Sequence, residues 1–339
     1  CARLKYDTNI YSVINIVQKG LFLVLSIGLV LTIKKNFSLI LMISNIASLL
    51  IANMIGIIKE RELWWPVRYK RGGPAISKRE LFFYGIPLMF SFGITWLFSA
   101  LDKLALDRFC TRADVGVYTS ALNLLTVFSV VRTSFNAIWM PSAVEHYEND
   151  KEDKSYFQKW NSFITILMLL FGAGMIMCSD LFVLLLGKEY RDAALIFPFL
   201  MFEPIMYTIS ETTVTGLVVT KKSGYQVIAA AVACATNFIG NWALTPLMGP
   251  QGAAISTGFS YIVFFAMRTI LSNRIYYVDY HLPKLAVMTI LLVIFAIYGS
   301  YQATLAYKVI FFVVYAIVLY FVYRKECKEA FLYAKALYG

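Results

Sequence analysis

The stretch "FSLILMISNIASLLIANMIGII" (37–58) decides the class of fold, because it runs for 22 residues without a charged side chain. A helix needs about 20 predominantly apolar residues to cross the hydrocarbon core of a bilayer. Nine further stretches meet this requirement, and they are 10–33, 80–101, 115–140, 160–178, 192–219, 224–246, 251–272, 284–301 and 305–323. The sequence therefore predicts an all-α, polytopic transmembrane bundle of about ten helices.

Composition supports the same class. Hydrophobic side chains make up 59% of the 339 residues and charged ones only 15%, and the mean hydropathy is +0.67. A soluble domain carries about 25% charged residues. The longest polar connectors, 59–79 and 142–159, have room for a short helix at most. The opening "CARLKYD" leads straight into a span without a signal peptide, so we expect that the beginning of the protein is missing.

The distribution of lysine and arginine predicts the orientation, because these residues are retained on the cytoplasmic side. With the N-terminus inside, the cytoplasmic segments hold 21 basic residues and the opposite segments hold 8. The segment "KERELWWPVRYKRGGPAISKRE" (59–80) contributes most. Basic loops that face anionic membrane lipids account for the net charge of +11, so nucleic acid is not expected as a partner. We expect a multi-pass membrane protein.

The sequence offers little for catalysis or metal binding. Both histidines, His146 and His281, lie in connectors without a partner at metal-ligand spacing. No glycine-rich phosphate loop is present. The cysteines are scattered without CxxC pairing, and they are Cys1, Cys110, Cys178, Cys234 and Cys327. We therefore expect neither an enzyme nor a metal or cofactor site.

Small and polar residues repeat every four positions in two of the spans. One stripe holds Ser44, Ser48, Ala52 and Gly56, and the other holds Ala229, Ala233, Asn237 and Asn241. Small residues let transmembrane helices approach closely, since lipid offers no hydrophobic drive for association. We interpret both stripes as packing faces.

Four charged residues inside spans are the candidates for function: Lys19, Arg132, Glu203 and Glu211. A charge at the centre of a transmembrane helix costs about 2.5–3.5 kcal/mol even on lenient scales, so it normally faces a bundle interior or water. Such charges either pair with one another or line a hydrated cavity. Pro204 follows Glu203 directly and is expected to kink the sixth span.

The basic candidates lie on polar stripes. Lys19 shares a helical face with Ser12, Asn15 and Ser26, and Arg132 has Ser129, Thr133 and Asn136 within four residues. Such stripes favour a transporter over a scaffold.

Two stretches carry a family likeness. The first is "YGIPLMFSFGITWLFSALDKLALDRFCTRADVGVYTSALNLLTVFSVVRTSFNAIWMPS" (84–142), with Asp102-Lys103 at the outer end of a helix, and the second is "ATNFIGNWALTPLMGPQGAAISTGFSY" (235–261). Both resemble the polysaccharide exporters, or Wzx-type O-antigen flippases, of the multidrug/oligosaccharidyl-lipid/polysaccharide exporter superfamily. The resemblance implies a MATE-like architecture of two six-helix lobes with two additional helices.

On that template the chain starts at the fifth of fourteen helices. Residues 1–58 would close the N-terminal lobe and 59–79 would be a cytoplasmic linker. Residues 80–273 would form the C-terminal lobe, and 274–339 the extra helices and tail.

The resemblance also implies a location and a function, which are the cytoplasmic (inner) membrane of a bacterium and the flipping of an undecaprenyl-diphosphate-linked oligosaccharide across it by alternating access. A polysaccharide polymerase and a chain-length regulator would be further partners. Substrate binding is assigned to Arg132, Lys19, Asn136 and Asn237, and ion coupling to Glu211, Glu203 and Asp102. The alternatives are a cation-coupled drug or metabolite antiporter and a membrane enzyme of polysaccharide assembly.

Overall fold

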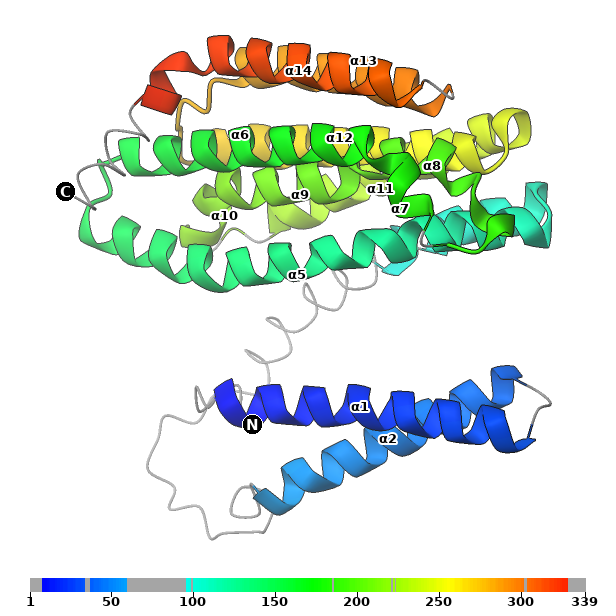
Figure 1. Ribbon diagram of the computed structural model, residues 1–339. Helices are drawn as coiled ribbons and strands as arrows, with labels where there is room; N and C mark the ends of the chain where they lie inside the picture. Colours follow the sequence, from blue (N-terminus) through cyan, green and yellow to red (C-terminus); the bar gives the residue numbers. More distant parts are fainter. Residues whose placement is uncertain are drawn as a thin grey trace, which may run out of the picture. The chain divides into compact units, whose positions relative to one another are not determined.

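A computed structural model describes residues 8–33, 37–59, 96–98, 100–184, 186–220, 222, 224–301 and 304–328. Every regular element in these ranges is helical, so the expected all-α class is confirmed (Figure 1). The chain forms two compact units, residues 1–76 and 77–339. Most of the third expected span and the whole of 60–79 lie outside the described residues. The assignment of lobes and linker therefore stays a prediction.

The first unit contains a helical hairpin of α1 (Thr8–Ile33) and α2 (Phe37–Lys59). Along α2 the stripe residues Ser44, Ser48 and Ala52 are buried. A Cβ added at Gly56 would lie 3.3 Å from Ile14 of α1. The prediction that this stripe is a packing face is therefore confirmed.

The second unit begins with helical residues 96–98 and 100–109. The elements that follow are α5 (Arg112–Asn149), α6 (Ser155–Met177), α7 (Ser179–Val183), a 3₁₀ turn η1 (Lys188–Tyr190), α8 (Ala193–Leu200), α9 (Phe202–Thr213), α10 (Thr215–Val219), α11 (Gly224–Met248), α12 (Pro250–Asn273), α13 (Leu282–Ser300) and α14 (Leu305–Val322). The α9 helix contacts α5, α6 and α12, while α13 and α14 pack on the α6 side of the unit (Figure 1).

The α5 helix is longer than expected. Its 38 residues span about 57 Å at 1.5 Å per residue, whereas the hydrocarbon core is about 30 Å thick. The expected span 115–140 is only its central part. Most of the expected connector 142–159 belongs to α5 and α6, and residues 150–154 alone join the two helices. The prediction of a long polar connector was wrong here, because Pro141 does not end the helix.

The expected sixth span, 192–219, is broken twice. The first interruption, at Met201, precedes Pro204, whose missing N–H leaves the Leu200 carbonyl without its helical donor. The expected kink is therefore confirmed. The second interruption, at Val214, lies where the Trp139 indole donates to the Glu211 carbonyl oxygen at 3.1 Å.

The α11–α12 hairpin is held by close backbone contact. Gly249 has a φ of 60°, which L side chains rarely adopt, and Pro250 follows at the start of α12. A Cβ added at Gly252 would lie 2.4 Å from the Leu244 carbonyl oxygen. The stripe of Ala229, Ala233, Asn237 and Asn241 is buried. The glycines of the second motif thus serve a tight helix pair.

Seven helical segments in the described ranges are long and apolar enough to cross a membrane. One of them, Ala193–Thr213, includes the break at Met201, and α1 contributes a shorter apolar stretch, Ile16–Thr32. The chain is a multi-pass membrane protein.

Candidate functional site

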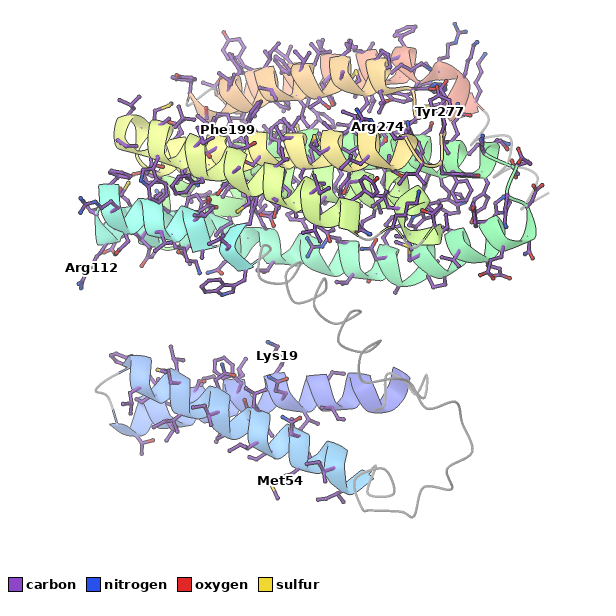
Figure 2. The ribbon with its side chains drawn as sticks, turned by 180° about the vertical axis from the view of Figure 1, so that it is seen from behind. Lys19, Met54, Arg112, Phe199, Arg274 and Tyr277 are labelled. Atoms are coloured by element: carbon purple, nitrogen blue, oxygen red, sulfur yellow. The ribbon has the colours of Figure 1, made fainter. Side chains whose placement is uncertain are left out.

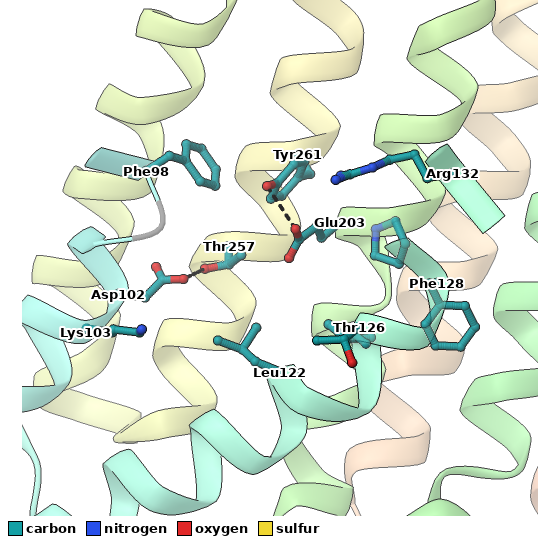
Figure 3. Close-up of a pocket in the computed structure, with 12 residues that line it drawn as sticks. Phe98, Asp102, Lys103, Leu122, Thr126, Phe128, Arg132, Glu203, Thr257 and Tyr261 are labelled. Atoms are coloured by element: carbon teal, nitrogen blue, oxygen red, sulfur yellow. Dashed lines mark hydrogen bonds between the residues drawn. The ribbon is translucent and has the colours of Figure 1, made fainter. Parts of the chain in front are cut away.

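A cavity of about 250 Å³ lies within the second unit, among the helix of residues 100–109, α5, α9 and α12 (Figure 3). It is lined on its apolar side by residues that include Phe98, Leu122 and Phe128. Its polar lining includes Asp102, Lys103, Arg132, Glu203, Thr257 and Tyr261. Charges of both signs therefore face one partly open cavity, and of these charged residues only Asp102 is fully buried.

Asp102 forms one wall of this cavity. Its Oδ2 atom accepts hydrogen bonds from the Tyr118 hydroxyl at 2.7 Å and the Thr257 hydroxyl at 2.8 Å. Its Oδ1 atom accepts from the amides of Asn237 at 3.0 Å and Asn241 at 2.7 Å. These four donors are neutral, and no lysine or arginine in the described ranges pairs with the carboxylate. The helices thus hold a buried acid without a counter-ion.

Glu203 lies on α9 and, like Asp102, has a neutral hydrogen-bond donor as its partner. The Tyr261 hydroxyl donates to its Oε1 atom at 3.2 Å. Tyr261 follows Thr257 by four residues, so one face of α12 holds both acids of the cavity (Figure 3).

Arg132 reaches the cavity from α5. Its Cζ atom lies 4.4 Å from the ring centroid of Tyr207, a cation–π contact. No ion pair joins Arg132 to a carboxylate within the described part of the chain. Its charge is therefore available to a ligand in the cavity.

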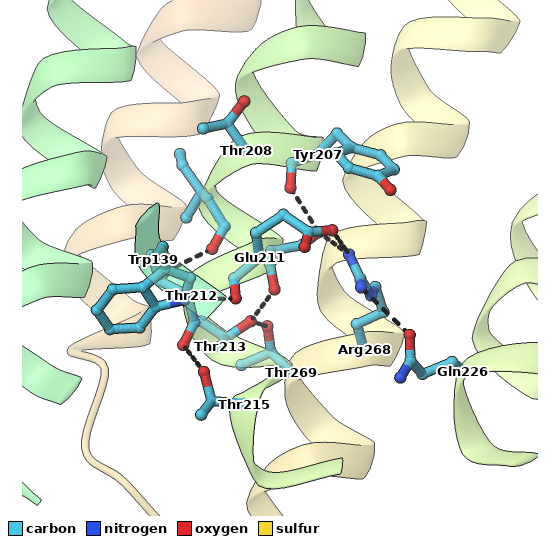
Figure 4. A network of polar contacts seen from close by, with 12 residues as sticks. Trp139, Tyr207, Thr208, Glu211, Thr212, Thr213, Thr215, Gln226, Arg268 and Thr269 are labelled. Carbon is cyan, nitrogen blue, oxygen red and sulfur yellow. Dashed lines mark hydrogen bonds and ion pairs between the residues drawn. The ribbon is translucent and has the colours of Figure 1, made fainter. Parts of the chain in front are cut away.

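Glu211 lies outside the cavity lining and is paired. The Arg268 Nη1 atom donates to Glu211 Oε1 at 2.8 Å and to the Ser210 hydroxyl at 2.6 Å, and Nη2 donates to Gln226 at 3.4 Å (Figure 4). The side chains of Arg268 and Glu211 are only 6% and 7% exposed. The partner of Glu211 is thus neither Arg132 nor Lys19 in this conformation.

The structure brings together three of the residues singled out from the sequence: Asp102, Arg132 and Glu203. Asn237 joins them through Asp102, and Asn136 lies one helical turn beyond Arg132 with a buried Oδ1 atom that has no hydrogen-bond partner.

Lys19 is exposed on α1, in the other unit (Figure 2). Its stripe neighbour Ser26 is buried and bonds the Phe22 carbonyl at 2.6 Å. The side chains of Ser12, Asn15 and Ser129 lie outside the described residues.

Two buried basic residues were missed. The sequence analysis did not count Arg268 and Lys308 among the charges inside spans, whereas they lie in α12 and α14 and are 5% and 1% exposed. Lys308 pairs with Asp180 at 2.9 Å. Their positions inside the expected spans 251–272 and 305–323 were the available signal. When Arg268 and Lys308 are left out of the count, the cytoplasmic segments still hold more basic residues than the opposite segments.

Among the described residues, no group of three or more histidine, cysteine, aspartate or glutamate side chains is placed to hold a metal ion. Asp102 and Glu203 are the acids that face the cavity. Any cation held there would depend on these carboxylates and the neutral oxygens around them.

The fold is that of a polytopic helical membrane protein. It is similar to the solved structure of the lipid II flippase MurJ in an inward closed conformation, with a TM-score of 0.61 and 14% sequence identity. The similarity covers 91% of this chain and 66% of that one. A likeness at this identity concerns the fold.

Sequence comparison gives the family. The chain is 24% identical over 196 residues to the capsular polysaccharide biosynthesis protein CapF of Staphylococcus aureus, which covers 55% of this chain and 48% of that protein. The chain thus spans about half the length of this curated relative. Residues 4–195 match the model of the polysaccharide biosynthesis protein family. The chain belongs to this family, and the match includes the first of the two motifs, 84–142.

Proposed function

We propose that the protein moves a lipid-linked oligosaccharide, carried on undecaprenyl diphosphate, across the bacterial cytoplasmic membrane by alternating access. The product would serve the synthesis of an O-antigen, capsule or exopolysaccharide. Membership of the polysaccharide biosynthesis family and the transporter-like fold support this proposal. The observation that carries it is the cavity with an arginine that has no carboxylate partner among the described residues.

Arg132 is suited to a diphosphate. A guanidinium presents parallel N–H donors that match two phosphate oxygens, and it keeps its charge at every physiological pH. In a recess between helices, water screens that charge less than it would at the open surface, so the charge attracts an anion more strongly. Ligand pockets usually measure about 300–1,000 Å³. At about 250 Å³ the cavity suits the phosphate end of the substrate, while the lipid tail stays in the bilayer.

We assign ion coupling to Asp102 and Glu203 rather than to Glu211. The two cavity acids have neutral partners, so a proton or a sodium ion can join them without breaking an ion pair. Glu211 would have to give up Arg268 first. Asn237 supports coupling through Asp102. Asn136 is a further substrate contact on the Arg132 helix, and Lys19 is a cationic one on α1.

The two carboxylates in the cavity favour one second candidate, a cation-coupled antiporter of drugs or metabolites. Its substrate would be attracted to Asp102 and Glu203, and Arg132 would oppose it. We propose transport over catalysis in either case.

The test is complementation. The full-length protein is expressed in a bacterium that lacks its own polysaccharide flippase, and surface polysaccharide is measured. Its return supports the proposal. Resistance to cationic drugs without return of polysaccharide supports the antiporter and contradicts a flippase.

A further inference from the structure

Arg132 and Glu203 face the same cavity with opposite charges and yet are not paired with each other (Figure 3). Each is instead held by a tyrosine. The Arg132 guanidinium lies 4.4 Å from the ring centroid of Tyr207, and Glu203 accepts a hydrogen bond from Tyr261 at 3.2 Å. The two charges thus remain unpaired beside one cavity, each with a tyrosine as its partner.

The two tyrosines act on different atoms. An aromatic ring attracts a cation through its face, and this contact leaves the N–H donors at the edge of a stacked guanidinium free. A tyrosine hydroxyl can donate a hydrogen bond to a carboxylate oxygen, as a water molecule would, without adding a charge. Tyr207 thus contacts Arg132 through its aromatic ring, and Tyr261 gives Glu203 a neutral donor.

We propose that Tyr207 and Tyr261 are positioning residues that keep Arg132 and Glu203 apart, so that the N–H edge of Arg132 stays available to a phosphate group. This inference rests on the proposed function and deepens it. It adds Tyr207 and Tyr261, to which the sequence analysis assigned neither substrate binding nor ion coupling. An Arg132–Glu203 ion pair would neutralise the cavity and compete with the anionic substrate.

The Tyr207 ring is itself held in place. It stacks on Phe264 with centroids 5.8 Å apart and planes 19° from parallel. The Arg268 Cζ atom lies 5.5 Å from the Tyr207 centroid and 5.0 Å from that of Phe264. Glu211 fixes Arg268 in turn. The ion pair outside the cavity therefore supports the ring on which Arg132 lies.

The experiment measures equilibrium binding of radiolabelled undecaprenyl diphosphate to the purified full-length protein in detergent. Tyr261→Phe removes the donor to Glu203 and lets this carboxylate turn to Arg132, so we expect binding about tenfold weaker, of the order of one charge-assisted contact. The double variant Tyr261→Phe/Glu203→Gln has no carboxylate to compete. It should bind within about threefold of the unmodified protein.

The second pair of variants tests the aromatic ring of Tyr207. Tyr207→Phe keeps the aromatic face and should bind normally, whereas Tyr207→Leu should weaken binding by about fivefold, as expected for loss of a cation–π contact. Tyr315→Phe is the matched control, because its buried hydroxyl bonds the Met288 carbonyl and does not line the cavity. It should bind normally.

The outcomes separate the inference from the function on which it rests. If Tyr261→Phe binds as well as the unmodified protein, or if Glu203→Gln does not restore it, the positioning role is wrong. A merely structural role predicts that the double variant is no better than the single one. If Arg132→Ala binds the probe normally, the assignment of the cavity to the substrate itself fails.

Discussion

The two carboxylates of α9, Glu203 and Glu211, lie eight residues apart and have opposite surroundings. Glu211 forms a buried ion pair with Arg268, while Glu203 has a tyrosine as its partner and faces a cavity. Breaking a buried ion pair is costly, because removal of one partner leaves the other charge uncompensated. A charge held by neutral donors is free to change its partner. From this comparison we propose a structural role for Glu211 and a functional role for Glu203.

We expect the largest effect on stability from breaking the Arg268–Glu211 ion pair. Arg268→Ala leaves Glu211 buried without a cation, which should lower the free energy of unfolding by about 3–5 kcal/mol. Thermal denaturation in detergent measures this loss. Arg274→Ala, at an exposed position of the same region (Figure 2), should change it by less than about 0.5 kcal/mol. Equal stability of the two variants would contradict the structural role.

A backbone contact near the cavity should give the next largest effect. The α11–α12 pair supplies three of the four donors to Asp102, and Gly252 lets the helices meet. In Gly252→Ala the new methyl group collides with backbone atoms of Leu244, so we expect a loss of about 1–3 kcal/mol in unfolding free energy.

Gly224→Ala is the control for this effect, because its Cβ meets nothing within 4 Å. It should be neutral or stabilise by up to about 1 kcal/mol through the unfolded chain. A destabilised Gly224→Ala with an unaffected Gly252→Ala would show that close helix packing does not limit stability here.

Removing charge without changing shape compares the two acids directly. Glu203→Gln should reduce polysaccharide export by about tenfold and flatten its pH dependence, since the amide cannot take up a proton. Glu211→Gln should export with the pH dependence of the unmodified protein, provided that it folds. Export assays at several values of external pH, at matched protein abundance, provide the test. A pH-insensitive Glu211→Gln variant would return the coupling role to Glu211.

The smallest effect lies in the exposed connector between α5 and α6. The Ser155 hydroxyl, which donates to Asp153 at 2.6 Å, holds the pKa of that carboxyl below its usual value, with a smaller contribution from His146. A lowered pKa contributes stability that is present above the unfolded value and is lost as the pH falls through the folded value.

Ser155→Ala should therefore move this small loss of stability to a higher pH. Unfolding midpoints recorded between about pH 3 and pH 5 would detect it. Ser142→Ala, whose hydroxyl bonds the Ile138 carbonyl, should leave the pH profile unchanged. If Ser155→Ala had the same pH profile of stability as the unmodified protein, the contact between Ser155 and Asp153 would not contribute to stability.

Long apolar runs made the helices predictable, and the break before Pro204 followed from the chemistry of proline. The second break, at Val214, has no such signal, because it depends on the Trp139 indole from another helix.

The charged residues themselves were also predictable, but their partners were not. Which arginine Glu211 meets is decided by the rotation of α12 against α9, and the pairing with Arg268 spans 57 residues of sequence. Nothing in the sequence distinguishes Tyr207 and Tyr261 from other tyrosines of the spans, and only the fold shows their contacts with Arg132 and Glu203.

Substitution of Arg132 tests the central claim most directly. The full-length protein and its Arg132→Lys and Arg132→Ala variants are compared for polysaccharide export in a bacterium without its own flippase, at equal abundance. The account predicts partial export for lysine, which acts as a point charge, and loss of most export for alanine. Normal export by Arg132→Ala would contradict it, because the cavity would then need no cation.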